Sequence, residues 1–472
     1  MTKKIIFFSV VYLLVSQVHA QTLSEYLEVA AENNPQLQAS FHQYLAAVEK
    51  VPQVGALPDP QVTFGYFTKP MELPMGKQRA EITLMQMFPW FGLLRNSKDE
   101  ASQMANARYQ GFLEAKNQLF YQIKSTWYEM YKLEEEIRLM EENIAILKSF
   151  ERLAISRFSS GNSGSTGSTT PRDLSSTQGN IQNKQGGGGM EGMGGSSTSS
   201  GNTRSSNSMN TMNGNTMSSG GSMVDVLRVQ MEIKELENTI ERLEDSRKPL
   251  HTRFNKLLNR PVSETVQVID TLVIGELPLD RLALLDSVMN NNPMVRMYDF
   301  ERQAFDAQKE MARREGNPMI GVGVNYMIFS PATNGEQMQM GGENMWMPMV
   351  SVTIPLNRKK YNAMKKEAEL LGNAAQFEQT ATRNQLSIQW DETIRDLDDA
   401  ARQIKKYQEQ ITLASQALRL ITTSYSAEGA GFEEVLRVQQ QLISYQLNLI
   451  NTIVDQNEII ARIEMLAAIN IN

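Results

Sequence analysis

Apolar residues recur along the chain at two spacings, one typical of helices and one typical of strands. Steps of three and four residues separate Ile123, Trp127, Met130, Leu133, Ile137, Met140, Ile144 and Leu147. The same steps separate Val226, Val229, Ile233, Leu236, Ile240 and Leu243, and again Val435, Val438, Leu442, Tyr445 and Leu449. This alternation is the apolar seam of a coiled coil, so the chain is predicted to contain long paired helices.

Four shorter stretches alternate apolar and polar residues with a period of two, as half-buried strands do. They are expected at about 60–68, 80–88, 318–329 and 347–356. In the first stretch, Val62, Phe64 and Tyr66 alternate with Thr63 and Gly65. The stretch 80–88 alternates least clearly of the four.

Two copies of one plan account for the order of these elements. The pentapeptide VLRVQ occurs at 226–230 and at 435–439, and the triplet NNP ends at Pro35 and at Pro293, an offset of 258. The segments DPQVTFGYF and NPMIGVGVN match at that same offset. Each half reads helix, strand, loop, strand, long helix, turn, long helix, so an internal two-fold repeat is predicted.

The first structural repeat is expected over 21–275, with a helical hairpin at about 92–258. The second is expected over 276–472, with a hairpin at about 358–468. The offset between matching residues falls from 267 at Phe158 and Tyr425 to 209 at VLRVQ, so the first repeat holds 58 additional residues. They belong to a low-complexity segment, 161–222, rich in Ser, Gly, Asn, Thr and Met, which has too little apolar surface to fold and is expected to be a mobile loop.

The N-terminal segment is typical of a secretory signal peptide. Residues 1–20 read MTKKIIFFSVVYLLVSQVHA, with two lysines, an apolar run and a small-residue cleavage site before Gln21. The apolar run has roughly half of the 20 residues that a membrane helix needs. Since no other stretch approaches that length, any passage through a bilayer is expected to use strands.

Cysteine content and charge exclude several classes of function. The chain contains no cysteine, which excludes disulfides, thiolate metal sites, catalytic thiols and a lipid-bearing N-terminal cysteine. The formal charge is −7 and becomes −9 when Lys3 and Lys4 leave with the signal peptide. No basic stripe offsets this charge, so a nucleic-acid partner is not expected.

Four strands are too few to form a closed membrane barrel, because the smallest transmembrane barrels have about eight. Open strand edges in lipid would leave backbone groups unpaired at several kcal/mol each. Other copies of the chain must therefore complete the barrel, and an oligomer is predicted.

The paired NNP openings, the two strand pairs, and the two turns SRFSSG...VDVLRVQ and TSYSAEG...EEVLRVQ together resemble the TolC-type outer-membrane efflux channels. The resemblance covers essentially the whole mature chain. It implies a mainly α fold with a membrane β-barrel: a homotrimer whose 12 strands form one barrel in outer-membrane lipid, continued by a coiled-coil tunnel in the periplasm. It also implies partners, namely a periplasmic adaptor and an inner-membrane pump.

The resemblance places both VLRVQ motifs beside the periplasmic tips, where the tunnel closes and meets the adaptor. Gly161 and Gly429 belong to the two turns. Asp225 and Glu434 precede the motifs and resemble positions of an acidic constriction ring. Arg228 and Arg437 stand where the family often has a second acid, so the ring would not be purely acidic. Either these pairs hold the gate closed, in which case charge reversal at Arg437 should change conductance, or they are ordinary surface ion pairs.

Methionines form two clusters outside the predicted helical seams. The first, in and beside the inserted segment, comprises Met190, Met193, Met209, Met212, Met217 and Met223. The second, toward the outward end by the resemblance, comprises Met338, Met340, Met345, Met347 and Met349. Thioether sulfur is a soft, neutral ligand that prefers Cu(I) and similar ions, whereas His42 and His251 alone offer little for zinc.

The methionine clusters resemble the copper and silver branch of the heavy-metal efflux channels. The sequence therefore predicts an exit channel that passes Cu(I), Ag(I) or other heavy-metal ions, with metal contact at both clusters. Alternatively, methionine is only abundant core filler and the insert a neutral linker, which would fit a channel for drugs or other organic compounds.

Neither an enzyme nor a cofactor is predicted. The chain has no phosphate-binding Gly-rich loop, no HExxH and no nucleophile elbow, and paired acids such as Asp398 and Asp399 lie in charged helical stretches. A soluble periplasmic coiled-coil scaffold would fit the helices and the signal peptide. It would leave the two matched strand pairs unexplained.

Overall fold

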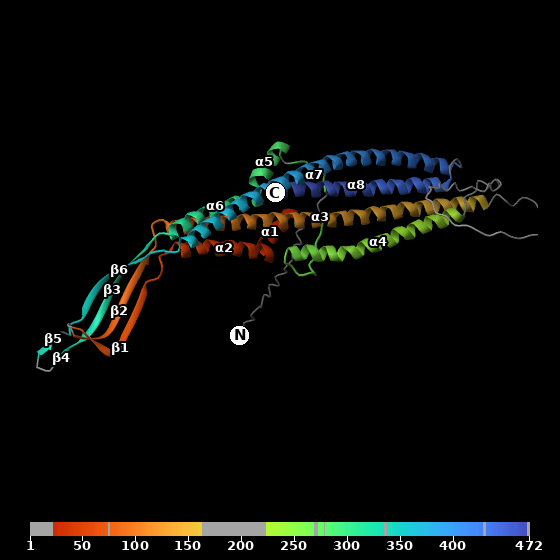
Figure 1. The fold of residues 1–472 in the computed structure, drawn as a ribbon. Helices are drawn as coiled ribbons and strands as arrows, with labels where there is room; N and C mark the ends of the chain where they lie inside the picture. Colours follow the sequence, from red (N-terminus) through yellow and green to blue (C-terminus); the bar gives the residue numbers. More distant parts are fainter. Residues whose placement is uncertain are drawn as a thin grey trace, which may run out of the picture.

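The computed structural model describes residues 22–73, 76–162, 223–268, 272–277, 279–334, 338–340, 342–427 and 431–469. The signal segment, the five insert methionines from Met190 to Met217, and Gly429 lie outside the described residues. The molecule is elongated, with a sheet at one end and the tips of two helical hairpins at the other (Figure 1).

Each half of the chain contributes one very long helix flanked by two shorter ones. The long helices are α3 (Leu93–Asn162, 70 residues) and α7 (Arg358–Ser426, 69 residues). α2 (Pro35–Gly55) and α4 (Met223–Leu257) pack one after the other along α3, while α6 (Pro293–Glu315) and α8 (Phe432–Ala467) do the same along α7 (Figure 1). At about 1.5 Å per residue, α3 alone is about 105 Å long.

The helices bury the predicted coiled-coil seams. All eight seam positions from Ile123 to Leu147 are buried, as are Val226, Val229, Val435 and Val438. This confirms that the steps of three and four residues mark the packed faces of these helices. In the described part of the chain, no helix has both the length and the apolarity needed to cross a membrane.

The repeated NNP triplet joins the short helices end to end. Asn34 caps α2 by accepting hydrogen bonds from the backbone N–H groups of Gln36 and Leu37, and its Nδ2 donates to the carbonyl oxygen of Leu257, the last residue of α4, at 2.8 Å. Proline follows at the first helical position, where its missing N–H costs nothing. One side chain therefore ends one helix and begins the next.

The second NNP triplet repeats this joint. Asn292 caps α6 by accepting from the N–H of Met294, and its Nδ2 donates to the carbonyl oxygen of Leu466 near the end of α8, at 3.0 Å. Both asparagines are buried, at 7% exposure for Asn34 and 3% for Asn292. α1 (Leu23–Asn33) and α5 (Arg281–Asn291) lead into these joints.

The four long strands form one antiparallel sheet in the order β1-β2-β3-β6 (Figure 1). They are β1 (Gln61–Leu73), β2 (Gly76–Phe88), β3 (Met319–Ser330) and β6 (Met345–Thr353). β1 and β2 reach further from the helices than the sequence indicated, and β6 ends earlier, at Thr353. A short hairpin of β4 (Ala332–Asn334) and β5 (Met338–Met340), which the sequence did not predict, extends the far end.

Candidate gate and strand surfaces

The two VLRVQ motifs place their valines in the core of the hairpin tips. Val226 and Val229 on α4, and Val435 and Val438 on α8, are each at most 7% exposed. Val226, Val229 and Val435 share one apolar cluster with α3 residues from Met140 to Ala154. The repeated pentapeptide therefore holds each short helix against the same bundle.

An arginine of α3 contacts an aromatic pair of the second hairpin near the tip. Tyr425, 2% exposed, packs against Phe432 with 5.1 Å between ring centroids. Arg157 Nη1 donates to the backbone oxygen of Tyr425 at 2.7 Å, and its Cζ lies 4.4 Å from the centroid of the tyrosine ring. Burial raises the pKa of the Tyr425 phenol above its usual value, so it stays neutral at physiological pH. Sequence analysis missed these contacts between hairpins.

The charged residues predicted at the gate differ in their partners. Arg228 Nη1 on α4 lies 3.0 Å from Glu433 Oε2 on α8, so this ion pair crosses between the hairpins. Arg437 Nη2 lies 3.6 Å from Glu434 Oε1 within the first turns of α8. Both pairs are exposed. Glu433, which the sequence did not single out, is thus an acid that links the two halves at the tips.

The remaining predicted gate positions lie at the ends of the same helices. Asp225 is in the first turn of α4, and Glu434 is in the first turn of α8. A negative side chain there favours the helix by opposing the positive end of its dipole. Gly161 is near the end of α3.

A buried polar pair also links the hairpins within the apolar core. Gln439, the last residue of the second VLRVQ motif, donates through Nε2 to Asn143 Oδ1 at 2.6 Å. Asn143 Nδ2 in turn donates to the carbonyl oxygen of Leu139 at 2.7 Å. Gln439 is 1% exposed and Asn143 is 2% exposed. The matching Gln230 of the first motif is exposed and donates to Glu151 instead.

Replacing Gln439 by leucine is expected to destabilise the tip by about 1–3 kcal/mol, because Asn143 Oδ1 then loses its partner in an apolar surrounding. The double variant Asn143→Leu/Gln439→Leu should recover most of that loss, since both polar groups are then gone. Chemical unfolding of the four members of this double-mutant cycle measures the coupling. Gln230→Leu, the matched exposed control, is expected to change stability by less than about 0.5 kcal/mol.

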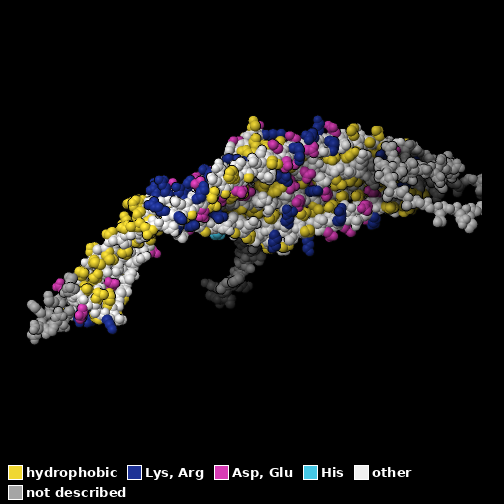
Figure 2. Space-filling view, in the orientation of Figure 1, with side chains coloured by type: hydrophobic (Ala, Val, Ile, Leu, Met, Phe, Trp, Pro, Cys, Tyr) yellow, Lys and Arg dark blue, Asp and Glu magenta, His cyan; other side chains and the backbone are white. Residues whose placement is uncertain are grey.

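The sheet has one strongly apolar face that is exposed in the single chain. Paired residues of neighbouring strands share a face, and the register joins Val62 to Leu84, Leu84 to Val324 and Val324 to Pro348. The exposed large residues on this face are Val62, Phe64, Tyr66, Ile82, Leu84, Phe88, Ile320, Val322, Trp346, Val350 and Val352. Figure 2 shows hydrophobic side chains over much of the sheet, and Lys and Arg gathered where the helices meet it.

The opposite face of the sheet carries polar residues, glycines and methionines. The register joins Thr83 to Asn325 and Asn325 to Met347, and Met345 and Met349 share this face because they are two positions away along β6. Met338 and Met340 form part of β5 at the far end. Met223, at the start of α4, is at the other end of the molecule (Figure 1). Among the described methionines of the two predicted clusters, Met223 is therefore far from those of β5 and β6.

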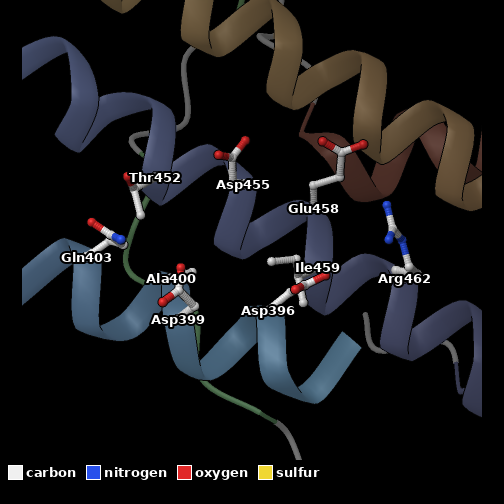
Figure 3. A pocket seen from close by; sticks show the side chains of 9 residues that line it. All are labelled: Asp396, Asp399, Ala400, Gln403, Thr452, Asp455, Glu458, Ile459 and Arg462. Atoms are coloured by element: carbon white, nitrogen blue, oxygen red, sulfur yellow. The ribbon is translucent and has the colours of Figure 1, made fainter. Parts of the chain in front are cut away.

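A pocket of about 370 Å³ on the helical bundle is lined by Asp455 and by three acids that have polar partners (Figure 3). Asp396 pairs with Arg395 at 2.6 Å, and Asp399 pairs with Arg402 at 2.9 Å. Glu458 accepts a hydrogen bond from Ser125 Oγ at 2.7 Å. Among the residues that the structure describes, no group of three or more His, Cys, Asp or Glu side chains is arranged to hold a metal ion. This pocket is therefore an ion-paired surface.

The acidic pairs of the helices also have structural partners. Asp398, which the sequence left as a solvated acid, receives two hydrogen bonds from Arg281 at 2.5 and 3.1 Å. The hydrogen bond from Arg281 holds the pKa of the Asp398 carboxyl below its usual value. Burial raises the pKa of the Asp455 carboxyl in the pocket, and the charge of Lys132 opposes this rise.

The fold is shared with outer-membrane channels of known structure. The outer-membrane channel OprN has a TM-score of 0.65 and 13% sequence identity, covering 95% of this chain and 90% of that chain. VceC of Vibrio cholerae, an outer membrane protein, has a TM-score of 0.65 and 14% sequence identity, covering 94% of this chain and 96% of that chain. CusC, described for conformational changes accompanying folding and transmembrane channel formation, has a TM-score of 0.65 and 13% sequence identity, covering 95% of this chain and 92% of that chain.

No protein-family model and no curated protein matches the sequence. The likeness in structure nevertheless extends over nearly the whole chain. It confirms the predicted fold class, a mainly helical molecule with four long strands in one antiparallel sheet, of the TolC type.

Proposed function

We propose that this protein is the outer-membrane exit channel of a tripartite efflux system. The observation that carries this proposal is the fold, since outer-membrane channels match 94–95% of the chain. In this arrangement the sheet lies in the outer membrane and the helices form a tunnel in the periplasm. A periplasmic adaptor docked at the hairpin tips, fed by an inner-membrane pump, would supply the substrate.

The exposed apolar face of the sheet supports a position in lipid. Aromatic residues flank the aliphatic ones on this face, with Tyr66 and Trp346 toward the far end and Phe88 toward the helices, where the exposed Phe91 follows in the turn before α3. Tyr66 pairs with Ala80, and the nine residues of β2 from Ala80 to Phe88 agree with the 9–11 that a tilted strand needs to cross a bilayer. Aromatic girdles at both interfaces are typical of such sheets.

The sheet also fits completion by further copies of the chain. β1 and β6 are its two edges, and they run in opposite directions because all neighbouring strands are antiparallel. The β6 edge of one chain can therefore pair antiparallel with the β1 edge of the next, so that no edge stays open in lipid. Three chains would give a closed ring of 12 strands, as the resemblance implies.

Membrane fractionation and the mass of the purified assembly test this function. We expect the chain to remain with the outer membrane through a carbonate wash and to purify in detergent as a trimer that conducts ions in a planar bilayer. Release by the wash as a water-soluble monomer would overturn the channel and would favour the periplasmic scaffold.

For the substrate we propose Cu(I) or Ag(I). The support is the methionine content of the insert and of the strands, because thioethers select soft ions. A strain lacking this chain should become sensitive to copper and silver, and a version with Met190, Met193, Met209, Met212 and Met217 changed to serine should restore less resistance than the natural chain. Sensitivity to organic drugs alone would favour the drug-efflux alternative, which has the same fold.

For the gate we propose that Asp225, Arg228, Glu434 and Arg437, with Glu433, help to hold the tips closed. Arg228→Glu should raise conductance and antibiotic leakage, because it replaces an attraction between hairpins with repulsion. An exposed ion pair contributes up to about 1 kcal/mol and a like-charge pair costs a similar amount, so the open population should rise by at most about thirtyfold. Arg437→Glu, which alters a pair within one helix, should have the smaller effect. Unchanged permeability in both variants would assign these residues to ordinary surface pairing.

A further inference from the structure

Methionine thioethers line one face of the sheet over most of its length. Two come from β2, Met85 and Met87, which lie two positions apart and therefore on the same face. The register places Gly323 between Met85 and Met349, and Gly321 between Met87 and Ser351. Two rows further out, Met327 pairs with Met345. The methionines of two repeats thus meet on one surface, although β2 and β6 are far apart in sequence.

The sulfur atoms of β2 converge over a glycine. The Oγ of Ser351 lies 3.7 Å from Met85 Sδ and 3.9 Å from Met87 Sδ, so both thioethers reach across β3 toward β6. They do so over Gly321: a Cβ at that position would lie 2.7 Å from Met87 Sδ and 3.5 Å from Met85 Sδ. An alanine at this position would therefore have to displace Met87 Sδ and the Oγ of Ser351, which would lie 2.5 Å from its Cβ.

The third thioether belongs to the next row. Met349 is opposite Gly323, and on the other side of Gly323 is Met85. A Cβ at Gly323 would lie 2.7 Å from the backbone oxygen of Leu84 and 3.4 Å from the Cβ of Met85, so this position is restricted to glycine. Gly321 and Gly323 therefore leave a stretch of β3 without side chains between the methionines of β2 and β6. The flexible methionine side chains can cover this stretch.

Packing does not account for methionine on this face. The apolar residues that suit lipid are on the opposite face of the same strands, whereas the methionine face also carries Thr, Asn, Ser and Gly residues and the carboxylate of Glu81. Thioether sulfur needs no deprotonation to bind a metal and prefers soft ions to Zn²⁺. A cluster of neutral sulfur ligands next to a hydroxyl is suited to a monovalent soft cation.

We propose that Met85, Met87 and Met349 form a binding site for Cu(I) or Ag(I), positioned by Gly321 and Gly323. Successive methionines on one face of β6 are about 6.6 Å apart, so Met347 and Met345 continue the site as a series of thioethers toward the far end of the sheet. The proposal rests on the proposed function in one respect: in a closed ring with the aliphatic face in lipid, this face lines the passage through which the ion leaves.

Titration of the full-length protein in detergent with silver nitrate tests the site, with the methionine methyl groups labelled with carbon-13 for NMR. The five insert methionines from Met190 to Met217 are first changed to serine to remove competing ligands. Addition of Ag(I) should shift the methyl signals of Met85, Met87 and Met349, whereas Zn²⁺ should leave them unchanged. The variant M85L/M87L/M349L, similar in volume, should bind Ag(I) at least about tenfold more weakly, since changes even outside the ligand shell cost metal sites 10–100-fold.

Met311→Leu is the matched control. Met311 Sδ accepts a hydrogen bond from Ser97 Oγ at 3.1 Å, so this variant removes another serine–methionine contact, in the helices rather than the sheet. Its Ag(I) affinity should equal that of the parent. Gly321→Ala keeps all three ligands but displaces Met87 Sδ, so it should weaken Ag(I) binding. This variant tests the site if the triple variant does not fold.

The outcomes separate the metal site from the channel. A trimer whose three strand methyl signals do not respond to Ag(I), or whose triple variant binds as tightly as the parent, would overturn the site and leave the channel intact. Shifts caused equally by Zn²⁺ would also overturn it. A protein that binds Ag(I) at these methionines but is a water-soluble monomer would support the site and overturn the channel.

Discussion

Replacing Val62 by arginine is expected to reduce assembly of the protein in the outer membrane sharply. Val62 is 68% exposed in the single chain, so its loss breaks few internal contacts. It lies on the apolar face of the sheet, in a row with Leu84 and Val324 between the two aromatic ends. If that face contacts lipid, an arginine near the middle of the bilayer costs about 2–4 kcal/mol.

Thr63→Arg provides the matched control, because Thr63 is the next residue of β1, is also exposed and points to the other face. In the proposed channel its side chain would face the passage instead of the lipid, so assembly should remain close to that of the parent. The amounts of trimer in the outer membrane after carbonate washing measure both effects. Equal amounts for the two variants would contradict the assignment of the faces and the proposed position in lipid.

Trp127→Ala is expected to destabilise the helical bundle by about 3–5 kcal/mol. Trp127 on α3 is 2% exposed and contacts two other rings, with centroid distances of 5.5 Å to Tyr26 on α1 and 5.7 Å to Phe254 on α4. Truncation would leave a cavity where three helices meet. Unfolding in guanidinium, followed by the circular dichroism of the helices, should have a lower midpoint concentration. Protease should also release α1 faster, and both results would show the loss of stability.

The control for this prediction is Tyr26→Phe, which keeps the ring that packs at 5.1 Å from Phe254 and removes only the hydroxyl. Its effect should not exceed about 1.5 kcal/mol, the net contribution of a typical hydrogen bond. A Trp127→Ala variant as stable as the Tyr26→Phe variant would mean that this aromatic cluster does not hold α1 against the bundle.

The sequence predicted the helices better than the strands, for a physical reason. A helical seam needs one apolar face and a charged opposite face, so the period is clear from Ile123 to Leu147. In β2 one face has Ile82 and Leu84, while the other has Met85 and Met87. Because methionine counts as apolar, both faces of this strand appear hydrophobic and the alternation is weak. The feature that obscured the strand is the one that suggests the metal site.

The side-chain partners at the hairpin tips could not be predicted from the local pattern of residues. The two VLRVQ motifs are identical, yet Gln439 is buried against Asn143 and Gln230 is exposed. Likewise, Arg228 pairs with Glu433, which is 205 positions away. Such contacts depend on how the two hairpins pack against each other. The repeated motif does not show which of its two copies faces the other hairpin. The motif predicted where the helical hairpins turn, but it did not predict the hydrogen bonds between the hairpins.

The asparagine joints suggest how the tips move. At each joint two helices are aligned by side-chain hydrogen bonds, from Asn34 to Leu257 and from Asn292 to Leu466, rather than by a continuous backbone. Two rods that meet in this way can bend at the junction without unwinding a helical turn. Because each joint lies at the C-terminal end of its helix, α4 and α8 can tilt as whole helices relative to α2 and α6, each about a hinge made of one asparagine side chain.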